Sequence, residues 1–318
     1  MEGEDRYVVC IGAACMDEYY TAQSWPEEGN KCLVDSTANL TGGMIPNAAC
    51  VFAGYGVKTY LYDVMNASSA SMALLEDLKG YGLDVSAVQF DDSLPDAKCI
   101  IVLTPGDRTI LVVDSHKPVV ELDGERLALM RNAAYIYTTV FEMKRFKDPV
   151  AFVKDLKAHG AQIVYDIEAS TFSAEDMELL SLADILFFNE FGFSKFKGEA
   201  GDEACFQSLF DSGVKIVTVT LGKNGSLVRT PDDADRTGVV DFEVVDPTGA
   251  GDTFNSSFVR CILAGKDIHE AAKFANMAAS WSVTQLGAKG GVNSVEAVER
   301  MVREHYTEES VSNDTKGV

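Results

Sequence analysis

The stretch Asp246-Pro-Thr-Gly-Ala-Gly-Asp-Thr-Phe254 decides how this chain folds. The segment Val239–Val245 leads into it and is expected to be a strand, and a helical pattern starts near Thr253. Glycines at such a junction let successive N–H groups point into one concavity at the positive end of the helix. The stretch therefore predicts a strand–turn–helix anion site with the Asp252 carboxylate beside it.

Asp252 has two interpretations at this position. It could cap the helix, or it could accept a proton from a substrate hydroxyl while the amides hold the charge on a transferred phosphoryl group. A Gly-x-Gly turn before a helix is a weak signal, so the local sequence alone favours the helix cap. The rest of the chain has to distinguish the two.

Upstream of this stretch, apolar runs alternate with helical patterns. Most of the runs are continuous, as in parallel strands that are covered on both faces. One helix has clear ends, with Asp148-Pro149 at its start and Gly160 after its last turn. This order predicts a doubly wound α/β fold. The expected strands are Tyr7–Ile11, Thr59–Tyr62, Tyr135–Val140, Gln162–Tyr165, Ile185–Phe188, Lys215–Thr220 and Ser226–Arg229.

Two segments interrupt the alternation and predict a small lid of β-strands over the open end of the main sheet. Residues 18–40 are strand-like but polar, and residues 97–114 form a hairpin pattern around Pro105-Gly106-Asp107. We expect one domain over residues 1–306, with helices at about Thr253–Leu263, Ile268–Leu286 and Ser294–His305. Residues 307–318 are polar without apolar periodicity and are expected to be a disordered tail.

The composition excludes several classes of protein. A formal net charge of -22 argues against binding to a nucleic-acid backbone, which needs a basic surface. No apolar run approaches the roughly 20 residues that span a bilayer. The seven scattered cysteines form no C-x-x-C pair, which indicates a reduced, cytoplasmic protein.

Two more motifs extend the argument to nearly the whole chain. They are Gly42-Gly43-Met-Ile-Pro-Asn47-Ala-Ala, followed by Gly54-Tyr-Gly56, and Thr220-Leu-Gly222-Lys-Asn-Gly225. Together with the first stretch, and in this order, they resemble the signatures of the ribokinase-like (PfkB) carbohydrate kinase family from about Tyr7 to Tyr306. The resemblance implies a three-layer sandwich with a mostly parallel central sheet and a β-strand lid. It also implies ATP, Mg²⁺ and, in several members, a monovalent cation such as K⁺.

The resemblance assigns roles to residues of this chain. Asp252 matches the catalytic base, and the anion hole matches Gly249, Ala250 and Gly251. The family positions that contact the sugar are matched here by Asp17, Gly43, Asn47 and Glu142. The positions that contact the nucleotide are matched by Asn189, Thr220, Gly222, Gly225 and Asn276. The positions that bind a monovalent cation in several members are matched by Asp246 and Thr248.

Each of these residues also has a plainer interpretation. Asp17 could be a turn residue, Asn47 a helix cap and Glu142 a solvated loop acid, while Asn276 could face water. Arg108, at the hairpin tip, could reach a substrate carboxylate or phosphate, but solvent is the expected location.

One departure from the family pattern concerns magnesium. The family often carries Asn-x-x-Glu before the nucleotide motif, whereas this chain has Asn189-Glu190-Phe191-Gly192. Glu190 remains, as does Asp166 at an earlier strand end, so either Glu190 takes the place of the missing carboxylate or the metal is held differently.

Phosphorylation of a hydroxymethyl group of a sugar or polyol is the leading expectation. A nucleoside kinase on the same fold is an alternative, because Tyr19, Tyr20 and Trp25 could form a slot for a base. A sensor that binds sugar or nucleotide without turnover is a second alternative. A dinucleotide-binding dehydrogenase fits poorly, because Gly12-Ala-Ala-Cys-Met-Asp17 is not Gly-x-Gly-x-x-Gly. Open edges of lid strands commonly pair, so a homodimer through the lid is also expected.

Overall fold

A computed structural model describes residues 6–105, 107–168 and 173–306 of the chain. The expected disordered tail, residues 307–318, lies outside the described residues. Within the described ranges, no helix combines the length and apolar character that crossing a membrane requires.

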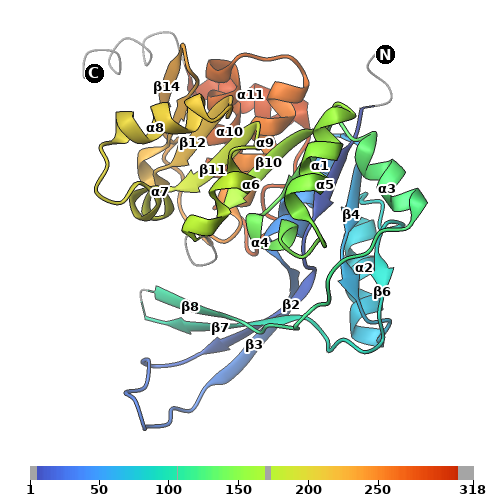
Figure 1. Cartoon of the computed structure of the whole chain (residues 1–318). Coiled ribbons are helices and arrows are strands. Elements are labelled where there is room, and N and C mark those ends of the chain that lie inside the picture. The colour runs from blue at the N-terminus through green and yellow to red at the C-terminus, as the bar shows by residue number, and fades with distance from the viewer. Residues whose placement is uncertain (1–5, 106, 169–172, 307–318) are drawn as a thin grey trace.

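An eight-stranded sheet forms the centre of the molecule (Figure 1), with the order β14-β13-β12-β11-β10-β9-β1-β4. The strands from β4 to β12 in this order are parallel, and β13 and β14 are antiparallel at one edge. The seven strands predicted for this sheet, from Tyr7–Ile11 to Ser226–Arg229, are each confirmed to within two residues at either end. The bounds are β1 (Val8–Ile11), β4 (Thr59–Tyr62), β9 (Tyr135–Thr138), β10 (Gln162–Ile167), β11 (Ile185–Asn189), β12 (Ile216–Thr220), β13 (Ser226–Arg229) and β14 (Ala234–Thr237).

Helices cover both faces of this sheet, which gives three layers. In β1, Val8 and Cys10 pack into one core, and Val9 and Ile11 pack into the other. Because both faces are buried, the strand has no polar alternation. One layer contains α1 (Met44–Gly54), α2 (Ser69–Gly80), α9 (Ala250–Leu263), α10 (Ile268–Ser282) and α11 (Val295–His305). The other contains α3 (Gly124–Arg131), α4 (Val140–Met143), α5 (Pro149–Ala158), α6 (Met177–Leu180), α7 (Glu190–Lys197) and α8 (Asp202–Asp211).

A second sheet has the strand order β3-β2-β7-β8 and projects from the three-layer body at the end where β1 leads into β2 (Figure 1). Its strands lie where the sequence predicts the lid strands. The bounds are β2 (Cys15–Thr21), β3 (Asp35–Gly42), β7 (Lys98–Thr104) and β8 (Asp107–Val112). A pair of two-residue strands, β5 (Val64–Met65) and β6 (Gln89–Phe90), lies apart from both sheets.

The predicted strand Val239–Val245 is wrong. Its backbone N–H groups bond to the end of α10 instead of to a neighbouring strand: Val240 donates to Ser280 Oγ, and Val245 donates to the carbonyl of Val283. The sheet already ends at β14, and Val244 and Val245 are each 61% exposed. The run has strand-like composition, but α10 satisfies its backbone.

The glycine-rich turn places α9 through a close backbone approach at Gly249. This residue has a φ of 79° at the N-cap of α9, and a Cβ atom there would lie 2.0 Å from the carbonyl oxygen of Ala288. Helix α9 therefore begins at Ala250, three residues earlier than the helical pattern indicates.

Gly249→Ala should destabilise the fold more than Gly265→Ala, which is a matched control. Gly265 has a φ of 80° but open space around its Cβ position, so alanine there should cost only about 1 kcal/mol of backbone strain. At Gly249 the clash with Ala288 adds to the same strain. Urea unfolding measures both free energies, and equal losses would show that the close approach has no energetic weight.

Candidate active site

The candidate residues gather beyond the carboxyl ends of the parallel strands, where open α/β sheets usually bind ligands. Asn189 ends β11 and Thr220 ends β12, while Glu142 and Glu168 follow β9 and β10. The end of β1 leads into β2, which carries Asp17.

Asp252 lies in the first turn of α9 and is held by α1. Asn47 Nδ2 donates a hydrogen bond of 3.1 Å to Asp252 Oδ2. Burial is the main cause that raises the pKa of Asp252 well above its usual range, and the charges of Asp166, Glu168 and Asp17 add to it. The bond from Asn47 opposes the shift but does not cancel it.

The structure brings two further carboxylates to the site: Asp166, which the sequence identified only as an acid at a strand end, and Glu168, which the sequence interpretation did not identify. Asp166 accepts hydrogen bonds from Tyr137 Oη at 3.0 Å and Asn255 Nδ2 at 2.7 Å, and burial raises its pKa to about 6. Glu168 is exposed as a residue, yet partial loss of water raises its pKa and the charge of Glu142 adds to this. An acidic pair two residues apart at the end of an apolar strand is the signal that could have identified them.

The expected sugar-binding residues lie on three separate elements. Asp17 is 7% exposed on β2, and burial raises its pKa. Gly43 precedes α1 with a φ of 108°, and a Cβ there would lie 2.3 Å from the carbonyl oxygen of Ala13. Asn47 is 6% exposed, and its Oδ1 has no hydrogen-bond partner among the described residues. A buried acceptor of this kind suits a ligand hydroxyl.

Glu142 is not a solvated loop acid. It is buried and forms an ion pair of 2.6 Å with Arg145 Nη1. Burial raises its pKa, although Arg145 and Lys117 oppose the shift. Lys117 is paired with Asp63, which also accepts a hydrogen bond from the N–H of Ala14. These buried pairs order the backbone just before Asp17.

The expected nucleotide residues divide into two groups. Thr220, Gly222 and Gly225 lie together where β12 turns into β13, and Gly222 and Gly225 have φ values of 57° and 84°. Asn276, by contrast, is 2% exposed and donates to Ser226 Oγ and the carbonyl of Ala272. It neither faces water nor has a free amide hydrogen, so its contacts indicate a structural role beneath β13.

The segment that departs from the family pattern forms the start of α7. Asn189 caps α7 and accepts a hydrogen bond of 2.6 Å from the N–H of Gly192. Glu190 is exposed at the start of that helix.

Asp246 and Thr248 shape the turn before α9. Asp246 accepts 2.9 Å bonds from the N–H groups of Thr248 and Gly287. Burial alone would raise the pKa of Asp246, but these bonds outweigh it and the net pKa is lowered. Arg108 was expected in solvent. It remains exposed, but its Nη1 donates a 2.9 Å bond to Thr248 Oγ1 and so joins β8 to the turn.

Known proteins are similar to this chain in both sequence and fold. Residues 5–294 match the model of the pfkB family carbohydrate kinases. A ribokinase of Bacillus subtilis is 28% identical over 304 residues, which cover 93% of this chain and 99% of that protein. A nucleoside kinase of Methanothermobacter thermautotrophicus is 25% identical, covering 93% of this chain and 96% of that protein. A ribokinase of Arabidopsis thaliana, solved with ribose and ATP, superposes with a TM-score of 0.81 at 24% identity and covers 94% of this chain and 99% of that one.

Fold and sequence together define a phosphotransferase that uses an alcohol group as acceptor. The chain belongs to the pfkB family of carbohydrate kinases. The predicted fold class, a ribokinase-like three-layer sandwich, is confirmed.

Asp166→Asn should stabilise the protein in a pH-dependent way. The folded-state pKa of about 6 lies above the ordinary value of 3.8, so ionisation of Asp166 costs stability as pH rises through this window. Asparagine keeps an acceptor for Tyr137 and Asn255. The variant should therefore gain roughly 1–3 kcal/mol at pH 8, and the gain should vanish near pH 4.

Urea unfolding at a series of pH values measures this difference. Asp91→Asn is the control, because hydrogen bonds from Ser93 lower the pKa of Asp91, and no gain at high pH is expected. A gain for Asp166→Asn that does not change with pH would contradict the raised pKa of Asp166.

Proposed function

We propose that this kinase transfers the γ-phosphoryl group of ATP to a hydroxymethyl group of a sugar or related polyol, with Asp252 as general base. One observation carries the proposal. Asn47 on α1 holds the Asp252 carboxylate in the first turn of α9, where burial raises the pKa of Asp252. A carboxylate made more basic in this way is suited to take a proton from a hydroxyl near neutral pH.

The start of α9 supplies the complementary charge. The first N–H groups of a helix lack partners within the helix, and the helix dipole adds positive potential there. We assign the anion hole to Gly249, Ala250 and Gly251, whose amides would hold the charge on the phosphoryl group during transfer. Base and anion hole then lie within one turn of the same helix.

Asp17, Gly43 and Asn47 are the proposed acceptor contacts. Asn47 Oδ1 has no partner among the described residues, and both it and the Asp17 carboxylate are hydrogen-bond acceptors. Acceptors suit the several hydroxyl donors of a sugar. Glu142 is already paired with Arg145, so a sugar contact through Glu142 would have to share its carboxylate with that ion pair.

The nucleotide is proposed to lie along Asn189, Thr220, Gly222 and Gly225. Asn276 would act only by supporting β13 from behind, through its bond to Ser226. ATP-dependent phosphoryl transfer uses Mg²⁺, which neutralises charge on the phosphates.

Asp166 and Glu168 fit magnesium better than Glu190 does. Their pKa values are raised in company with that of Asp252, and a cation among these carboxylates would relieve their mutual repulsion. Glu190, by contrast, is exposed at the start of α7. For K⁺, we retain Asp246 and Thr248 as the proposed residues, because Asp246 is a carboxylate with a lowered pKa.

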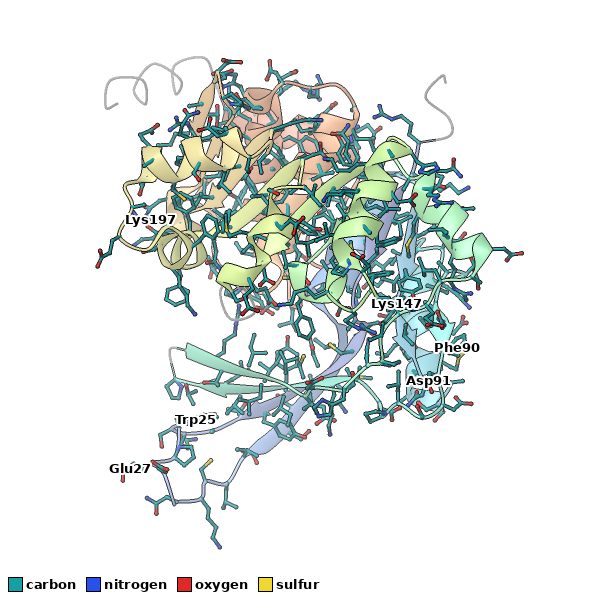
Figure 2. The ribbon with its side chains drawn as sticks, in the orientation of Figure 1. Trp25, Glu27, Phe90, Asp91, Lys147 and Lys197 are labelled. Atoms are coloured by element: carbon teal, nitrogen blue, oxygen red, sulfur yellow. The ribbon has the colours of Figure 1, made fainter. Side chains whose placement is uncertain are left out.

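A nucleoside acceptor is the second candidate. The similarity to a nucleoside kinase favours it, as does Tyr19, which is 8% exposed and electrostatically coupled to Asp17. Trp25 is 51% exposed in the segment between β2 and β3 (Figure 2), so the described residues do not enclose its ring.

A homodimer through the second sheet is supported by exposed apolar side chains, including Ile110 and Val112 on β8 and Leu33 just before β3. β3 and β8 are also the edge strands of that sheet. Light scattering after size exclusion tests this arrangement, and a monomer at micromolar concentration would contradict it.

The reaction is tested by an ATP-consumption screen over pentoses, hexoses, sugar acids and nucleosides. On the acceptor found, Asp252→Asn should lower kcat by roughly 10²–10⁴-fold while leaving acceptor affinity within a few-fold. Asp241→Asn, an exposed carboxylate before the same turn, is the matched control and should retain activity.

Retained activity in Asp252→Asn would remove Asp252 from the base role. Binding of a sugar or nucleoside by calorimetry, without turnover of any compound in the screen, would favour the sensor.

A further inference from the structure

Two thiols and a carboxylate converge beside the proposed acceptor site. Cys15 and Asp17 are two residues apart on β2 and so point to the same face of the sheet. Cys99 lies opposite Asp17 on the neighbouring strand β7. Cys15 Sγ is 3.6 Å from Cys99 Sγ and 3.5 Å from Asp17 Oδ1. One ligand atom from each residue lies within 4.8 Å of the other two.

These separations match a tetrahedral metal site. With metal–sulfur bonds of about 2.3 Å and metal–oxygen bonds of about 2.1 Å, tetrahedral angles place two sulfurs about 3.8 Å apart and sulfur and oxygen about 3.6 Å apart. The Cys15–Cys99 and Cys15–Asp17 separations already have this spacing, and the third pair lies within 4.8 Å. A disulfide would instead need the two sulfurs at about 2.05 Å, which requires movement of the strands or side chains.

We propose that Cys15, Cys99 and Asp17 form a binding site for a thiophilic divalent cation such as Zn²⁺. Three protein ligands leave a fourth position for water or another oxygen ligand. Cys99 is partly exposed and gives the ion a route in. Binding replaces the two thiol protons, which are released to solvent, so affinity should rise with pH.

The site predicts inhibition, and this part rests on the proposed function. Asp17 is the proposed contact for acceptor hydroxyls, and one of its oxygens would be taken by the metal. A bound Zn²⁺ should therefore compete with the acceptor and not with ATP.

Cobalt spectroscopy tests the metal site without any acceptor. Co²⁺ added to the whole protein should produce sulfur-to-metal charge-transfer bands and the visible bands of tetrahedral cobalt, at one ion per chain. Cys15→Ser and Cys99→Ser should each weaken or abolish the charge-transfer bands, and Zn²⁺ should displace the cobalt. Cys32→Ser, which removes an exposed and isolated thiol, is the matched control and should leave the bands unchanged.

Absence of the bands in the wild type, or their survival in both Cys15→Ser and Cys99→Ser, overturns the site. Circular dichroism confirms that each variant is folded before its spectrum is taken.

Kinetics test the inhibition. Zn²⁺ should raise the KM for the acceptor in the wild type and in Cys32→Ser, but have little effect in Cys99→Ser, because that variant has lost one ligand. Cobalt bands without competition would keep the metal site and overturn its inhibitory role. A failed acceptor screen would leave the cobalt result intact, so the two proposals fail separately.

Discussion

The hydrogen bond from Asn47 to Asp252 joins the two parts of the chain on which the proposed reaction depends. Asn47 lies on α1, which follows strands β1 to β3, while Asp252 lies on α9, more than 200 residues later. The bond holds a carboxylate in a place where burial and neighbouring charges oppose its ionisation. Such a site costs stability and is kept where the basicity is useful.

Side-chain hydrogen bonds join the second sheet to this centre. Arg108 on β8 donates to Thr248 in the turn before α9, and Lys289 donates 2.8 Å to the carbonyl of Thr41 on β3. Lys289 also forms an ion pair of 2.9 Å with Asp77 on α2. A movement of the sheet would therefore alter both the proposed acceptor contacts on β2 and the turn that presents the anion hole.

Apolar runs of strand length were sufficient to predict the parallel strands, because strands buried on both faces have that composition. The strand prediction failed at Val239–Val245, which Asp241 and Glu243 interrupt and where α10 supplies backbone partners that a local pattern cannot reveal. Glu168 was missed, and Asp166 was identified only as an acid at a strand end, because their electrostatic effect on Asp252 is a tertiary property. Arg108 illustrates the same limit: a hairpin tip suggests solvent, yet the hairpin places its guanidinium against Thr248.

The sequence motifs were a good guide to which segments lie together and a poorer guide to what each residue does. Gly43, Asn47, Gly249 and Asp252 lie where the two signatures would bring them together, because α1 packs against α9. Asn276 lies on α10, whose helical pattern was predicted, but its side chain is buried under β13. Nothing in its local sequence distinguishes a buried amide from an exposed one. Glu142 is likewise paired with an arginine three residues away.

The pH dependence of kcat/KM for the acceptor, at saturating Mg-ATP, tests the role of Asp252 most directly. The wild type should lose activity on the acid side at a pH well above the ordinary aspartate pKa, because Asp252 must be ionised to accept the proton. Asn47→Ala removes a bond that stabilises the ionised form, so this acid limb should move to higher pH. Ionisation of ATP is common to both enzymes and cannot cause the difference. A profile that is flat down to about pH 4, or an acid limb that Asn47→Ala leaves in place, would contradict the assignment of Asp252 as the base.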